Sequence, residues 1–63
     1  MNAYYPDYKP KQPDCFERMT LAFGMAKTKK ELETIVFMYV LDMNYDRQDI
    51  VVAQGRAERA LIP

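Results

Sequence analysis

Histidine, serine and tryptophan are absent from the sequence, and cysteine occurs once, at Cys15. Without histidine and serine, neither a Ser/His/Asp triad nor a Cys–His pair can form. A single cysteine excludes an intrachain disulfide, and no Cys/His cluster is present to hold a structural zinc. We therefore expect no catalytic residues, no metal and no cofactor, and we predict that the protein is not an enzyme.

Glycine is also scarce, with only Gly24 and Gly55 in the chain. Two isolated glycines leave no glycine-rich loop to cradle a phosphate group. Three carboxylates lie close together in the sequence, but they lack the glycine and the spacing of a calcium-binding loop. Helix capping accounts for them more simply. These carboxylates are Asp42, Asp46 and Asp49.

The longest apolar run has seven residues, Ile35 to Leu41. A membrane-spanning helix needs about 20. The first ten residues contain three tyrosines and two prolines in place of the apolar segment of a signal peptide. A lone cysteine fits a reducing compartment. We predict a soluble, cytoplasmic protein with no membrane partner.

Nine basic and nine acidic residues cancel, but the two halves of the chain differ in sign. Residues 1–30 carry six basic and three acidic side chains, and residues 31–63 carry the reverse. This asymmetry fits a solvated surface with attraction between the halves. It also fits an interaction surface of both signs that serves head-to-tail association.

The apolar run from Ile35 to Leu41 fits a buried strand as well as a helix. Its flank favours the helix, because Thr28 and Glu31 have the spacing of a capping box. We predict a helix over residues 29–43. Its core-facing stripe, at helical spacing, is Leu32, Ile35, Val36, Tyr39 and Met43.

Three more apolar residues of this helix lie off that stripe: Phe37, Met38 and Leu41. A helix that is apolar nearly all round must be buried on more than one side. The cover is either the rest of a compact monomer or a second copy of the chain, and both remain open. The off-stripe residues are therefore candidate partner-binding residues.

A first helix is predicted over residues 14–26, with Asp14 as its N-cap and Glu17 at the capping-box position. Gly24 within it is expected either to end the helix early or to let another helix approach closely, and we prefer the second. The core face of this helix is predicted to consist of Phe16, Met19, Phe23 and Ala26.

A third helix is predicted over residues 46–61, where Asp46 caps the N-terminus and Asp49 adds favourable negative charge to the first turn. Asn44 is expected to end the preceding helix in the left-handed conformation. The fold class is therefore all-α, a small three-helix domain over residues 14–63.

Residues 1–13 contain three prolines, which argue against a helix, and no alternation typical of a strand. We predict a flexible or irregular, Pro/Tyr-rich arm. It is either a disordered tail or a segment whose tyrosines pack on the helices or bind a partner. Those tyrosines are Tyr4, Tyr5 and Tyr8.

The start of the chain, Met1-Asn2-Ala3-Tyr4-Tyr5-Pro6, together with its length and lack of enzyme motifs, resembles the small early accessory proteins of lambda-like bacteriophages. Such proteins are encoded between the exonuclease and excisionase genes. The resemblance implies an accessory role in the host cytoplasm, such as biasing phage development by binding a host protein.

Two segments, Leu32 to Val36 and Asp46 to Ala53, are similar in pattern to two helices of the Hha/YmoA nucleoid-modulating family. The proline-rich start departs from that family. This resemblance implies the alternative function, a small DNA-binding or nucleoid-associated transcription modulator. Its candidate nucleic-acid residues are Lys27, Lys29 and Lys30.

Direct DNA binding requires a basic face, whereas the net charge here is zero. Asp46 and Asp49 at the start of the third helix would also repel phosphates. The sequence therefore favours a non-enzymatic regulatory or interaction protein that binds a host protein.

Overall fold

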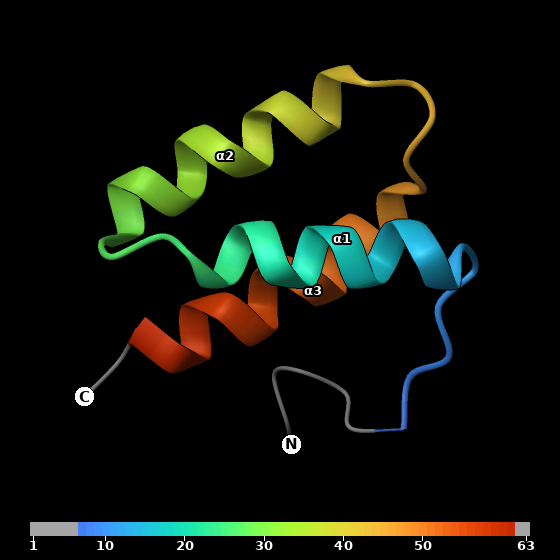
Figure 1. Cartoon of the computed structure of the whole chain (residues 1–63), viewed down its shortest axis with the longest axis horizontal. Helices are drawn as coiled ribbons and strands as arrows, with labels where there is room; N and C mark the ends of the chain where they lie inside the picture. Colours follow the sequence, from blue (N-terminus) through green and yellow to red (C-terminus); the bar gives the residue numbers. More distant parts are fainter. Residues whose placement is uncertain (1–6, 62–63) are drawn as a thin grey trace.

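The computed structural model describes residues 7–61, which form three α-helices and no strand. Helix α1 spans Pro13–Gly24, α2 spans Lys29–Leu41, and α3 spans Arg47–Leu61 (Figure 1). Helix α2 lies along one edge of the molecule, and α1 and α3 lie on the same side of it. The predicted all-α, three-helix fold is confirmed.

Helix α1 begins one residue earlier than predicted, and Asp14 is not its cap. Gln12 occupies the N-cap position and makes no side-chain capping bond. Pro13 is the first helical residue, where its fixed φ suits the helix and its missing N–H costs nothing. Asp14 therefore lies in the first turn, where its charge still complements the helix dipole.

Gly24 ends α1 and does not serve close helix packing. A Cβ built at this position would meet nothing within 4 Å. Of the two expected roles for Gly24, an early end to the helix is confirmed and the preferred one, a close helix approach, was wrong. Beyond Gly24, the amides of Met25 and Ala26 donate to the carbonyls of Ala22 and Phe23, both at 3.2 Å, and close the last turn.

The predicted cap of α2 at Thr28 is confirmed, and the return bond from the Glu31 side chain is shifted by one residue, to the amide before the cap. The amide of Glu31 donates to Thr28 Oγ1 at 3.1 Å, and Glu31 Oε1 accepts from the amide of Lys27 at 2.8 Å. At the other end, α2 stops at Leu41, and the backbone of Asp42 is extended. Asn44 is therefore not the residue that ends the helix. Its amide instead donates to Asp42 Oδ1 at 3.0 Å.

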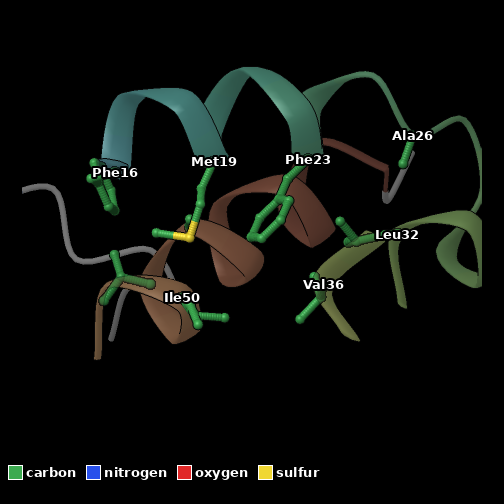
Figure 2. Packing of buried hydrophobic residues seen from close by; sticks show 9 residues of the cluster. Phe16, Met19, Phe23, Ala26, Leu32, Val36 and Ile50 are labelled. Atoms are coloured by element: carbon green, nitrogen blue, oxygen red, sulfur yellow. The ribbon is translucent and has the colours of Figure 1, made fainter. Parts of the chain in front are cut away.

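The core lies between the three helices, and Figure 2 shows Met19 and Phe23 of α1 pointing toward Val36 of α2 and Ile50 of α3. The predicted core face of α1 is confirmed, since all four of its residues are buried. Helix α2 contributes only Leu32 and Val36. The buried apolar residues are Phe16, Met19, Phe23, Ala26, Leu32, Val36, Ile50, Val52 and Ala53.

The expectation that α2 is buried on more than one side was wrong for the single chain. One side of α2 packs against α1 and α3, and Ile35, Tyr39 and Val40 are partly buried beside this contact. No other element covers the opposite side within residues 7–61.

Candidate functional site

The side of α2 turned away from the core carries large apolar side chains. Phe37 is 60% exposed, Met38 63% and Leu41 65%. Phe37 and Leu41 are four residues apart and therefore neighbours on the helix surface, with Met38 beside them. We call these three residues the outer face of α2. Their exposure agrees with their position off the core-facing stripe.

Met43 was placed on the core-facing stripe, but it is 95% exposed. Helix α2 ends two residues before it, so the helical periodicity that assigned it to the core no longer holds there. Met43 lies two residues after Leu41 in the chain and adds another exposed apolar side chain beyond the end of α2.

A shallow, open depression adjoins the outer face of α2. It is lined by Met38, Tyr39, Asp42 and Tyr45. The Tyr39 and Tyr45 rings meet edge to face, with centroids 4.8 Å apart, and Phe23 contacts Tyr39 in the same way at 5.4 Å. The aromatic contacts connect the depression to the core. Its shape suits contact with a protruding side chain better than enclosure of a small molecule.

Arg18 of α1 contacts the lining of this depression. Its Nη1 donates to the Tyr45 hydroxyl at 3.5 Å, and this hydrogen bond raises the pKa of Arg18. Arg18 also lines a second shallow depression, together with Asp14, Glu17 and Leu21. The surface beside the outer face of α2 therefore offers charges of both signs.

Tyr8, a candidate partner-binding residue, packs within the protein. Its hydroxyl donates to Asp49 Oδ1, and its ring lies 5.9 Å from the ring of Phe16. The amides of Lys11 and Gln12 also donate to the Asp49 carboxylate, at 3.1 and 2.9 Å. The arm was expected to be either a disordered tail or a segment whose tyrosines pack on the helices or bind a partner. For Tyr8, the structure shows packing on the helices. Tyr4 and Tyr5 lie outside the described residues.

Asp49 is fully buried, which the sequence did not indicate. Burial alone would raise its pKa, but the hydrogen bonds from Tyr8, Lys11 and Gln12 outweigh burial and lower it. Burial and the Asp49 carboxylate raise the pKa of Tyr8 to about 12. No local signal predicts this pairing, because a carboxylate in the first turn of a helix already has a simpler explanation.

Asp46 caps α3, as predicted, because its Oδ2 accepts from the amide of Asp49 at 3.0 Å. The amide of Asp46 in turn donates to Gln12 Oε1 at 2.8 Å. The side chain of Gln12 therefore binds the start of α3 and does not cap its own helix. These contacts join the segment before α1 to the N-terminus of α3.

The candidate nucleic-acid residues are exposed around the turn between α1 and α2. Lys9 and Lys11 lie before the opposite end of α1, which is 12 residues long, or about 18 Å at 1.5 Å per residue. The fold thus separates the five lysines into two groups. The group at the turn is Lys27, Lys29 and Lys30.

Within residues 7–61, no three His, Cys, Asp or Glu side chains lie close enough together to hold a metal ion. Across the same residues, no helix combines the length and apolar character that crossing a bilayer requires. No protein-family model matches the sequence, and comparisons with curated proteins and with solved structures find no match.

Proposed function

We propose that this protein is a non-enzymatic interaction protein that acts by binding another protein through the outer face of α2. The observation that carries this proposal is the exposure of Phe37, Met38 and Leu41 on the side of α2 opposite the core. Apolar side chains grouped on a surface are typical of protein–protein contacts. In the core that residues 7–61 form, none of these three side chains takes part.

The chemistry of the outer face suits a helical or grooved apolar partner. Phe37 supplies a large, rigid anchor, and the unbranched thioether of Met38 adapts to an irregular surface. Arg18 and Asp42, beside the adjoining depression, offer polar contacts at the rim of the interface.

We further propose that the partner is a host protein and that binding influences phage development or host physiology in the host cytoplasm. The support for this step is the resemblance of the chain to small early accessory proteins of lambda-like phages. The outer face of α2 supports only the more general statement that the protein binds another protein.

A comparison of two double variants in a bacterial host-lysate pulldown tests the proposal. Phe37→Asp with Met38→Asp places charge on the outer face of α2. Leu21→Asp with Met25→Asp places the same charge on an exposed residue of α1 and on the exposed residue that follows its end, and serves as the matched control, called the α1 variant. Circular dichroism establishes that both variants keep their helices.

We expect the α2 variant to lose the partners that the wild type and the α1 variant recover. Equal recovery by a folded α2 variant would show that the outer face of α2 is not the binding surface.

A further inference from the structure

We propose that Tyr8, Lys11 and Gln12 form a carboxylate-binding site, which Asp49 of the same chain fills and which binds a free carboxylate of matching size when the Asp49 side chain is removed. We call these three residues the carboxylate site. The inference is independent of the proposed function, because the site lies between the segment before α1 and the start of α3 and shares no residue with the outer face of α2.

The donors of the carboxylate site bind both oxygens of the Asp49 side chain. The amide of Lys11 donates to Oδ1 at 3.1 Å, and the next amide in the chain, that of Gln12, donates to Oδ2 at 2.9 Å. The hydroxyl of Tyr8 also donates to Oδ1. Hydrogen bonds to an ionised acceptor are stronger than those between neutral groups. Two successive amides and a phenol therefore recognise a carboxylate as a group, whichever molecule carries it.

The buried position of this carboxylate gives the emptied site a reason to bind a ligand. Asp49 has no exposed surface. If its carboxylate is removed, the three donors that faced it lose their acceptor, and buried donors without an acceptor cost free energy. A free carboxylate in the same place restores all three hydrogen bonds.

Other contacts hold the donors in place without the Asp49 side chain. The side chain of Gln12 accepts from the amide of Asp46 at 2.8 Å, and its carbonyl accepts from the amide of Phe16 at 2.8 Å. The ring of Tyr8 packs on Phe16, with centroids 5.9 Å apart. Asp46 caps α3 through the backbone amide at position 49, which alanine and glycine both keep. A site organised in this way loses little free energy in ordering its donors around a ligand.

The size of the missing group selects the ligand. Asp49→Ala removes only the carboxylate, so formate replaces it and turns its hydrogen toward the Cβ that alanine keeps. The methyl group of acetate would overlap this Cβ in a close-packed interior. Asp49→Gly removes the Cβ as well, and acetate then replaces the whole side chain. The two variants should therefore prefer different acids, formate for alanine and acetate for glycine.

Thermal unfolding of the full chain, followed by circular dichroism, tests the site in sodium formate, sodium acetate and sodium chloride at about 0.2 M and about pH 7, where both acids are ionised. We expect formate to raise the melting temperature of Asp49→Ala by about 4 °C or more relative to chloride. In so small a domain, this shift corresponds to about a fivefold increase in the ratio of folded to unfolded chains. Acetate should have the larger effect on Asp49→Gly.

Two controls separate binding at the site from the general effect of a salt on stability. In the wild type the site is filled, so formate and acetate should have only that general effect. Tyr8→Phe combined with Asp49→Ala removes one of the three donors and should reduce the formate shift to about half or less. If Asp49→Ala has little helix in chloride, formate should restore the helical signal.

Equal formate shifts in the wild type and in Asp49→Ala would overturn the carboxylate site. The same order of formate and acetate in the alanine and glycine variants would also overturn it, because the size of the cavity would then not select the ligand. An Asp49→Ala chain that stays unfolded in formate as well as in chloride would overturn it too. None of these results bears on the outer face of α2, which the pulldown tests separately.

Discussion

The phenol of Tyr8 donates a hydrogen bond to the carboxylate of Asp49 across 41 positions of sequence. The same carboxylate accepts from the amides of Lys11 and Gln12, so three donors surround a side chain with no solvent exposure. This cluster fixes the segment before α1 on the first turn of α3. The first three predictions concern the contribution of this cluster to stability.

Replacing Asp49 by Asn should lower the free energy of unfolding by about 2 kcal/mol, measured by urea denaturation. The amide has the same size but only one acceptor oxygen, so its NH₂ group must face one of the three donors. Glu33→Gln, which changes an exposed carboxylate in the same way, should change stability by less than about 0.5 kcal/mol.

Tyr8→Phe separates the hydrogen bond from the packing of the ring on Phe16. We expect Tyr8→Phe alone to lower the free energy of unfolding by about 1 kcal/mol. In a chain that already carries Asp49→Asn, the same change should lower it by less. Full additivity of the two substitutions would contradict coupling between these side chains.

Stability should depend on pH at both ends of the range. Folding lowers the pKa of Asp49. Its ionised side chain therefore stabilises the fold at pH values above the pKa of an unfolded aspartate, about 4, and this stabilisation is lost as the pH falls below that value. The pKa of Tyr8 is raised to about 12, so its contribution is complete below about pH 10 and lost between about 10 and 12.

Urea denaturation midpoints measured as a function of pH test both the acid and the alkaline loss of stability. Tyr8→Phe is the control for the alkaline loss. That variant should show a weaker decline above about pH 10 than the wild type. If the wild type and the variant lost stability equally at alkaline pH, ionisation of groups other than Tyr8 would be the cause.

Gly24→Ala should stabilise the protein by about 0.5–1 kcal/mol. Gly24 is the last residue of α1, its φ lies outside the left-handed region, and an added Cβ meets no atom within 4 Å. Alanine therefore gains helix propensity without strain. Thermal unfolding followed by circular dichroism measures the change, and a lower melting temperature for the variant would disprove it.

Duplex DNA should not bind measurably at low salt. The lysines at the α1–α2 turn are separated from Lys9 and Lys11 by the length of α1, and the chain has no net charge. Titration at two salt concentrations is the measurement. Binding that weakens as salt rises, and falls further in a Lys29→Gln, Lys30→Gln variant, would instead support the alternative DNA-binding function.

The features predicted from sequence are those that neighbouring residues determine. The cap of α2 at Thr28, the core face of α1 and the cap of α3 at Asp46 all depend on spacings of four residues or fewer, and each is present. Periodicity also distinguished the exposed Phe37 from the buried Val36, because successive residues of a helix point about 100° apart around its axis.

The features that sequence missed depend on contacts between distant segments. The N-cap of α1 is Gln12 and not the predicted Asp14. The side chain of Gln12 is hydrogen-bonded to the start of α3, a contact between distant segments that local sequence does not reveal. Asp49 looked like an ordinary first-turn carboxylate, although its partners lie near the start of the chain. How many sides of α2 are covered also depends on tertiary packing, which the pattern of one helix does not specify.

The buried carboxylate of Asp49 has a consequence for where the chain can be cut. A fragment that starts at Pro13 would keep every helical residue but lose the phenol and both amides that surround this charge. Proteolysis in that stretch should therefore loosen α3, which lies far along the chain from the cleavage point. The shortest piece expected to fold begins at or before Tyr8, ahead of the first helical turn.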